Sequence, residues 1–388
     1  MGLSDMEYLV IGAGLSGGVI ARQLAEAGHK VEIWDRRHHI GGNMYDYIDE
    51  HGILVHKYGP HTFHTNKKVL YDYMCRFGEW IPYQLTCGAV IKHQFTPTPF
   101  NFKTIDQFYS ENDAALLKNA INHCFHRRLT ATVVEVLNAD DERIRNYGKF
   151  LFDYDYSLYT AKQWGISPAE VDPSILKRVP LRFSYDEGYF DDTYQVMPKV
   201  SYAAFFNKLL EHPNIVVRYG IDALDYLSVD SSGTRLSYNG EAAYDKTVIY
   251  TGALDELFQL DKGQLPYRSL RFEWHYDDMD SLQPYPVTAY PAEPYTRITE
   301  YKKLPVQQVQ GTSYAVEYSL PYKPGTKQEP YYPVLTKESQ MQAELYKKQA
   351  DLIDNFYYCG RLADFKYYNM DQALERALQV AEKILEEN

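Results

Sequence analysis

The sequence predicts an α/β fold in which a dinucleotide-binding, Rossmann-like domain is interrupted by a helical insertion and by an antiparallel β-sheet domain. Three observations support this prediction. A glycine-rich turn at residues 12–17 joins a strand to a helix. Between residues 104 and 165, apolar residues recur at helical spacing with few Gly or Pro. Tyr, Val and Phe, interrupted by Pro, dominate residues 267–335, as is typical of antiparallel strands and their turns.

The first glycine turn contains Gly12, Gly14 and Gly17, directly after an apolar strand. Glycines at these positions let the backbone approach a pyrophosphate, and the N-terminus of the following helix attracts its negative charge. The next predicted strand ends at Asp35, which follows the turn by about 20 residues and therefore suits a ribose hydroxyl. This arrangement of strand, turn, helix, strand and acid predicts a bound dinucleotide.

A second glycine turn lies close behind the acid, at Gly42 and the neighbouring Asn43. Flavin-binding Rossmann domains often have such a turn near the pyrophosphate, whereas nicotinamide dehydrogenases usually lack it, so FAD is the favoured dinucleotide. Arg36 and Arg37 leave an alternative open, because they suit the 2′-phosphate of NADP. Asp35 weighs against this alternative, since it would repel that phosphate.

The dinucleotide-binding domain is predicted to be discontinuous, because apolar parallel-strand patterns recur at residues 247–251 and 356–359. A capping box at residues 104–107 predicts the start of the helical insertion. The predicted units are a dinucleotide-binding domain at 1–83, 201–262 and 350–388, a helical domain at 103–170 followed by a mobile loop at 167–182, and an antiparallel sheet domain at 84–102, 183–200 and 263–349.

Composition excludes several classes of function. The net charge of −12 argues against nucleic acid as a partner. The four Cys form no CxxC pair, which indicates free thiols in a reducing compartment. No signal peptide or apolar run of membrane-spanning length is found, so a cytoplasmic protein is expected.

His56, His61 and His64 are clustered, but no carboxylate adjoins them. We therefore predict no metal site and interpret residues 59–61 as a stiff turn facing the cofactor.

Three arginines stand at turns or strand ends rather than on amphipathic helices: Arg178, Arg297 and Arg361. A guanidinium donates two parallel charge-assisted hydrogen bonds, which suits a diphosphate. Because the whole chain is acidic, an anionic substrate has to be bound by a local arginine cluster of this kind.

Several segments together resemble one known family. They are HKYGPHTFHTN at 56–66, YTAKQWG at 159–165, KRVPLRF at 177–183, PYTR at 294–297, EPYYPV at 329–334, and GRLA with YYNM at 360–370. These motifs resemble the bacterial type of UDP-galactopyranose mutase, and the resemblance extends over about residues 7–381.

The resemblance implies an isomerase with FAD as its cofactor. The expected reaction interconverts UDP-galactopyranose and UDP-galactofuranose, for cell-surface glycan biosynthesis, by covalent catalysis through N5 of reduced FAD and without net redox change. It further implies NAD(P)H or another reductant for the flavin, and a homodimer.

The resemblance also implies roles for individual residues. Arg178, on the mobile loop, and Arg297 are expected to clamp the diphosphate, and His61 to lie near the flavin and the sugar. The remaining expected substrate contacts are Tyr159 on the uridine side, Trp164 beside the sugar, Tyr189, Tyr332 and Tyr367 on the diphosphate, and Asn369. Flavin contacts are expected from Gly59, Arg361 and Met370, besides the two glycine turns.

One position departs from the family pattern. Many members have Asp where this chain has Asn369, so we expect Asn369 to contact the sugar rather than to act as an essential base.

Four alternatives stay open. The nearest is a related mutase for UDP-N-acetylgalactosamine, UDP-arabinose or dTDP-fucose, because the diphosphate contacts would be shared. The others are a flavin oxidoreductase of the amine-oxidase type, a non-catalytic nucleotide-sugar binder, and a nicotinamide dehydrogenase.

Overall fold

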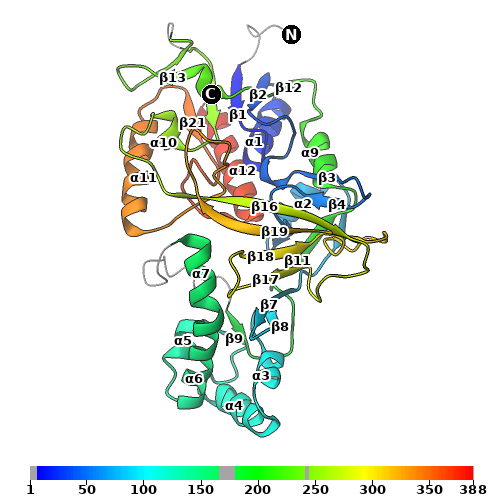
Figure 1. Cartoon of the computed structure of the whole chain (residues 1–388). Coiled ribbons are helices and arrows are strands. Elements are labelled where there is room, and N and C mark those ends of the chain that lie inside the picture. The colour runs from blue at the N-terminus through cyan, green and yellow to red at the C-terminus, as the bar shows by residue number, and fades with distance from the viewer. Residues whose placement is uncertain (1–6, 166–179, 241–243, 388) are drawn as a thin grey trace.

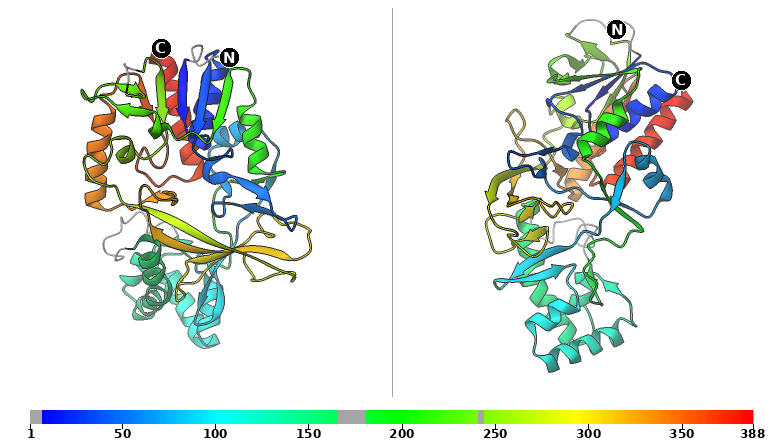
Figure 2. Two further views of the ribbon diagram at one scale, coloured as in Figure 1. Left: turned by 45° about the horizontal axis from the view of Figure 1, so that its top comes forward. Right: turned by 90° about the vertical axis from the view of Figure 1, so that its right-hand side faces the viewer.

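The computed structural model describes residues 7–165, 180–240 and 244–387. Figure 1 shows a parallel sheet with its covering helices at one end, a helical layer at the other, and a broad sheet that crosses between them. Figure 2 shows that the first and last described elements of the chain, the strand at Tyr8–Ile11 and the helix at Met370–Glu387, lie at the end that carries the parallel sheet. The structure therefore confirms the α/β class, with parallel and antiparallel sheets in separate layers.

The parallel sheet has alternating side chains that pack into two different cores. Val10 and Ile33 face one core together with α1, α9 and α12, while Leu9 and Trp34 face another together with α10 and α11. The strands, in spatial order, are β12 (Ile215–Tyr219), β2 (Val31–Asp35), β1 (Tyr8–Ile11), β15 (Thr247–Tyr250) and β21 (Phe356–Tyr358). The helices are α1 (Leu15–Glu26), α9 (Tyr202–Leu210), α10 (Leu254–Leu257), α11 (Lys337–Ala350) and α12 (Met370–Glu387).

The crossing sheet is antiparallel apart from one parallel pair, β17 with β7. Its strands, in spatial order, are β20 (Tyr332–Pro333), β16 (Tyr267–Asp277), β19 (Thr312–Pro321), β18 (Arg297–Glu300), β17 (Val287–Ala289), β7 (Cys87–Ile91) and β8 (Gln94–Thr98). The long pair β16 and β19 spans the molecule between its two end layers (Figure 1).

The helical layer packs around its own apolar core, to which β7 contributes Ala89 and Ile91. Its helices are α3 (Phe102–Phe108), α4 (Glu111–Cys124), α5 (Val133–Leu137), α6 (Glu142–Leu151) and α7 (Ser157–Trp164), and a π-helical turn at Phe152–Tyr156 joins the last two. The predicted start of the first helix at Thr104 was wrong, because Asn101 is the N-cap residue and Thr104 completes its capping box from the third helical position.

Shorter strands connect these layers. The predicted placement of residues 183–200 in the antiparallel sheet domain was wrong for β11 (Tyr194–Pro198), which pairs instead with β5 (Phe63–Thr65) and β6 (Trp80–Pro82). The pattern of alternating residues identified the strand but not its partners. The remaining elements are β3 (Asp46–Ile48), β4 (Leu54–His56), α2 (Lys68–Cys75), β9 (Thr130–Ala131), β10 (Leu181–Arg182), β13 (Leu227–Val229) and β14 (Leu236–Tyr238).

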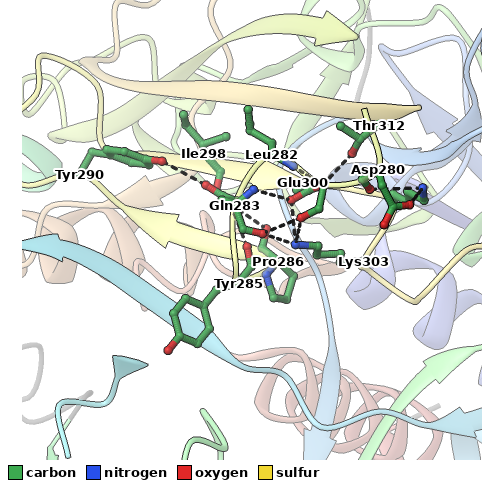
Figure 3. A network of polar contacts seen from close by, with 12 residues as sticks. Asp280, Leu282, Gln283, Tyr285, Pro286, Tyr290, Ile298, Glu300, Lys303 and Thr312 are labelled. Atoms are coloured by element: carbon green, nitrogen blue, oxygen red, sulfur yellow. Dashed lines mark hydrogen bonds and ion pairs between the residues drawn. The ribbon is translucent and has the colours of Figure 1, made fainter. Parts of the chain in front are cut away.

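A buried polar network fixes the end of β18 against the neighbouring loop (Figure 3). Glu300, which is fully buried, accepts hydrogen bonds from the backbone N–H of Leu282 at 2.9 Å and of Gln283 at 3.2 Å. It also accepts one from the Thr312 hydroxyl at 2.9 Å and pairs with Lys303 at 3.1 Å. A buried carboxylate is tolerated only with such complete pairing.

The same network extends to the helical layer. The Gln283 amide donates to the carbonyls of Tyr285 at 2.9 Å and Ile298 at 3.1 Å, and accepts from the Tyr290 hydroxyl at 3.2 Å. The Tyr290 carbonyl in turn accepts from the Lys162 ammonium of α7 at 2.6 Å. Helix α7 is thereby tied to the loop that precedes β18.

We expect Glu300→Ala to lower the free energy of unfolding by about 3 kcal/mol or more, because it leaves buried donors and Lys303 without their acceptor. Chemical denaturation measures this change. Asp280→Asn removes the carboxylate of an exposed pair with Lys302 and serves as the control, for which no change is expected. Equal stabilities of the two variants would contradict the role of the network.

Candidate active site

The first glycine turn lines a cavity of about 250 Å³ at the carboxyl end of β1. Gly12 has a φ of 107°, and a Cβ on Gly17 would lie 2.0 Å from the Gly12 carbonyl oxygen. A Cβ on Gly42 would lie 2.9 Å from the Gly14 Cα, so the second turn packs directly on the first. The sequence has glycines here because no side chain fits.

The acid and the arginines after β2 are held in place by hydrogen bonds. The Asp35 carboxylate accepts from the backbone N–H of Ala13 and of Arg37, each at 2.8 Å, and lines the cavity. Arg36 and Arg37 both pair with Glu329, at 2.5 and 3.1 Å. Burial alone would raise the pKa of Glu329, but these two guanidiniums hold that pKa below its usual value. Glu329 thus offsets part of their charge, and Glu256 and Asp222 also act on Arg36, which weakens the NADP alternative.

A second cavity, of about 280 Å³, lies over one face of the crossing sheet. It is lined by most of the residues that the sequence predicted for a nucleotide sugar: Tyr159, Tyr189, Arg297, Tyr332, Tyr367 and Asn369. The two cavities share a wall, formed by Asn43, His61, Tyr331, Arg361, Asn369 and Met370. The two cavities therefore lie side by side, with these six residues between them.

Arg297 is the first residue of β18 and forms a close ion pair with Glu317 of β19. Its Nε and Nη2 donate to one Glu317 oxygen at 2.8 and 2.7 Å, and the Thr296 hydroxyl donates to the other at 3.2 Å. Burial alone would lower the pKa of Arg297, but the negative charge of Glu317 raises that pKa above its usual value. Among the described residues no partner of Arg297 Nη1 is found, so these N–H groups are available to a ligand anion.

Phenols surround this guanidinium and remain protonated at neutral pH. Burial raises the pKa of Tyr332 to about 12 and raises that of Tyr159 further. The rings of Tyr332 and Tyr367 lie 5.9 Å apart between centroids. Neutral phenols donate hydrogen bonds without adding charge, which suits the oxygens of a diphosphate.

His61 lies on the shared wall as a neutral imidazole. Its Nδ1 lies 2.8 Å from the Gly59 carbonyl, which only accepts, so Nδ1 carries the hydrogen and Nε2 is an acceptor. Burial, aided by the charges of Arg361 and Arg297, lowers the pKa of His61 to about 4. His56 supports this turn, because its Nδ1 accepts from the His61 backbone N–H at 3.1 Å.

Arg361 holds the segment that leads into α12 in place through hydrogen bonds. It donates to the carbonyls of Tyr368 at 2.7 Å and Tyr331 at 3.3 Å, and lies 5.1 Å from the centroid of the Tyr367 ring. Asn369 and Met370 follow directly and line both cavities. This segment therefore joins the dinucleotide side to the tyrosine side.

Some predicted site residues are placed differently or not placed. Gly59 lines neither cavity and lies beside Arg297, where an added Cβ would be 3.7 Å from Nη2. Arg178 lies outside the described residues, and of Trp164 only the backbone at the end of α7 is described. The sequence analysis assigned no role to Glu317 or Lys162. Glu317 lies opposite Arg297 because of the register of β18 with β19, which the sequence alone does not give.

No group of His, Cys, Asp and Glu within residues 7–165, 180–240 and 244–387 is arranged to hold a metal ion. Over the same ranges, no helix is long and apolar enough to cross a membrane.

A glycine-lined cavity at the end of a parallel sheet, beside a second cavity lined by arginines and tyrosines, is typical of Rossmann-type proteins that bring a cofactor to a separate ligand. Comparison with family models is more specific: the model for UDP-galactopyranose mutase matches residues 156–367, and that for an NAD(P)-binding Rossmann-like domain matches residues 10–77. The chain belongs to the UDP-galactopyranose mutase family, which is a family of isomerases.

The similarity to its relatives extends over almost the whole chain. It is 34% identical to the "Probable UDP-galactopyranose mutase" of Klebsiella pneumoniae, over 99% of this chain and 96% of that one. It is 35% identical to the dTDP-fucopyranose mutase of Escherichia coli, over 98% and 99%. The crystal structure of a reduced UDP-galactopyranose mutase superposes with a TM-score of 0.72 at 15% identity, covering 99% of this chain and 96% of the other, which shows the shared fold.

We expect Gly14→Ala to fold normally but to lose its bound dinucleotide. The fold tolerates the added methyl group, because this Cβ meets only the Gly42 Cα at an ordinary 3.6 Å. Gly14 lines the cavity, however, so the methyl group hinders the close approach of a pyrophosphate to the backbone. The measurement is the ratio of bound dinucleotide to protein after purification. Gly78→Ala, whose added Cβ would meet only Phe205 at 3.9 Å, is the control. Full dinucleotide content in Gly14→Ala would show that the cofactor lies elsewhere.

Proposed function

We propose that the protein is an FAD-dependent UDP-galactopyranose mutase, which interconverts UDP-galactopyranose and UDP-galactofuranose. The observation that carries this proposal is the shared wall between the two cavities, because it would bring the sugar of a bound nucleotide sugar against the reactive ring of a bound flavin. Family membership supports the same assignment.

The residues of the first cavity fit an FAD. The N-cap residue of α1, Gly14, makes no side-chain capping bond, so the first N–H groups of the helix are available to a pyrophosphate. Asp35 suits the ribose, and Asn43, Arg361 and Met370 lie where the cavity turns toward the second one. Reduced FAD would supply a nucleophile, N5, for the anomeric carbon of the sugar.

The chain's own residues would hold the UDP in place while its bond to the sugar is broken. Arg297 would donate to the diphosphate through Nη1, in an orientation fixed by Glu317, and Tyr189, Tyr332 and Tyr367 would donate from their hydroxyls. His61, as a neutral acceptor, would orient a sugar hydroxyl through Nε2. Asn369 carries no charge and would contact the sugar.

Other parts of this proposal concern residues or partners outside the structure. Arg178 would supply a second guanidinium to the diphosphate, and Trp164 would lie beside the sugar. The homodimer, NAD(P)H or another reductant, and the role in cell-surface glycan synthesis stay predictions from the resemblance. The cytoplasmic location stays a prediction from the sequence.

A related mutase for dTDP-fucose is the second candidate, and the dTDP-fucopyranose mutase relative favours it. The dithionite-reduced, FAD-loaded protein should be assayed with a panel of UDP-galactose, UDP-N-acetylgalactosamine, UDP-arabinose and dTDP-fucose in their pyranose forms, with products separated by liquid chromatography. We expect the highest kcat/KM with UDP-galactopyranose. A higher value with dTDP-fucopyranose would assign the second candidate, and no conversion of any substrate would contradict both.

We expect Arg297→Ala to lower kcat/KM by about a hundredfold or more, because a charge-assisted contact to the departing diphosphate is lost. The FAD content should be unchanged, since Arg297 does not line the dinucleotide cavity. Arg271→Ala is the matched control, because Arg271 is an exposed arginine of the same sheet that pairs with Glu273. Full activity of Arg297→Ala would overturn the assigned role.

A further inference from the structure

A nucleotide sugar consists of sugar, diphosphate and nucleoside in that order, so the position of its sugar determines how the whole molecule lies in the second cavity. The proposed function, on which this inference rests, requires the sugar at the wall shared with the dinucleotide cavity. The diphosphate then lies near Arg297, and the nucleoside must occupy the part of the cavity remote from that wall. The lining residues that belong to the helical layer and its neighbouring strands are Gly88, Thr98, Phe100, Asp155, Tyr156 and Thr160.

Asp155 is the charged residue in this part of the cavity. It belongs to the π-helical turn before α7, and π-turns are frequent at functional sites. The residue is only 8% exposed, yet no hydrogen bond to its carboxyl is found among the described residues. Because the carboxyl lines the cavity, a ligand with matching hydrogen-bonding groups can reach it there.

The surroundings of Asp155 suit a flat ring. Tyr156 packs against Phe100 with ring centroids 5.7 Å apart, and both line the cavity. Tyr159, which is expected on the uridine side, lies one helical turn after Asp155 and lines the same cavity. Aromatic walls with one polar group are what a nucleobase requires, since its faces stack and its edge forms hydrogen bonds.

We propose that the Asp155 carboxyl binds the imide edge of the substrate's pyrimidine, accepting from N3–H and donating its own O–H to the O4 carbonyl. Uracil and thymine present this donor and acceptor side by side, and a protonated carboxyl matches them with two parallel hydrogen bonds. Asp155 is thus a specificity-determining residue for the nucleotide rather than for the sugar.

The protonation state of Asp155 supports this pairing. Burial raises its pKa to about 7, opposed by the charge of Lys162, so the protonated form is present below that pH and is lost above it. The other titratable side chains near it are Tyr147 and Tyr156 within the helical layer, and Tyr159, Tyr189, His64 and Arg297 along the cavity. The ionised carboxylate keeps the N3–H bond but faces the lone pairs of O4, so UDP binding weakens as the pH rises.

Binding of UDP and of UDP methylated at N3 to the FAD-loaded protein, measured by calorimetry, tests the proposal. We expect the wild-type protein to bind the methylated nucleotide about tenfold or more weakly, because its N3 cannot donate. In Asp155→Ala this difference should shrink to about twofold, because the acceptor is gone and the methyl group has room. An equal difference in both proteins overturns the proposal.

The pH dependence separates a base contact from a structural role. Asp155→Asn offers a neutral amide with the same donor and acceptor, so it should bind UDP well and lose the extra weakening of about fivefold that we expect for the wild type between pH 6 and 8.5. Asp153→Asn, on the exposed side of the same turn, is the matched control and should behave as the wild type. An Asp155→Asn variant with the pH profile of the wild type would contradict the inference.

The two proposals fail in distinguishable ways. A wild-type protein that binds no uridine or thymidine nucleotide at any pH would contradict the proposed function itself. A wild-type protein that binds UDP at pH 6 with the same affinity as Asp155→Ala would contradict only the role of Asp155.

Discussion

The ion pair between Arg297 and Glu317 is the constraint around which the site is arranged. A guanidinium in a cavity wall needs a counter-charge, and Glu317 supplies it from the adjacent strand, at a position that the register of β18 with β19 fixes. The pair holds Arg297 by Nε and Nη2 and leaves Nη1 toward a ligand. Its orientation is therefore set before any ligand arrives.

This pairing has a consequence for the charge of the site. Glu317 balances the charge of Arg297, and Arg361 donates to two backbone carbonyls in the wall between the cavities. Arg178, which lies outside the described residues, is the predicted second guanidinium for the diphosphate. The phenols, which burial keeps protonated, add donors at no cost in charge.

The fold brings these groups together from distant parts of the chain. The crossing sheet supplies Arg297 and Tyr332, α7 supplies Tyr159, and residues next to the start of α12 complete the wall that the two cavities share. The network around Glu300 and the bonds of Lys162 fix the loop before β18 to α7, so both sides of the second cavity form one rigid frame.

Sequence patterns predicted the parallel strands and the glycine turn with Asp35, because local periodicity and turn chemistry carry that information. The residues expected in the second cavity came instead from the resemblance of the motifs to a known family. Sequence patterns did not predict the role of Glu317, because that role depends on the register of two strands. They also did not predict that β11 pairs with β5 and β6, since the residue pattern of a strand does not identify its partner strand. Asp155 was also missed, because its importance lies in burial without a partner, which a sequence does not display.

The central claim is that a nucleotide sugar and the flavin meet at the shared wall. It is tested most directly by the flavin absorbance difference spectrum when UDP-galactopyranose is added to the FAD-loaded protein. We predict a saturable change that is absent at the same concentrations in Arg297→Ala, because a sugar placed at the wall alters the surroundings of the flavin ring. Saturable nucleotide-sugar binding that leaves the flavin spectrum unchanged would contradict the account.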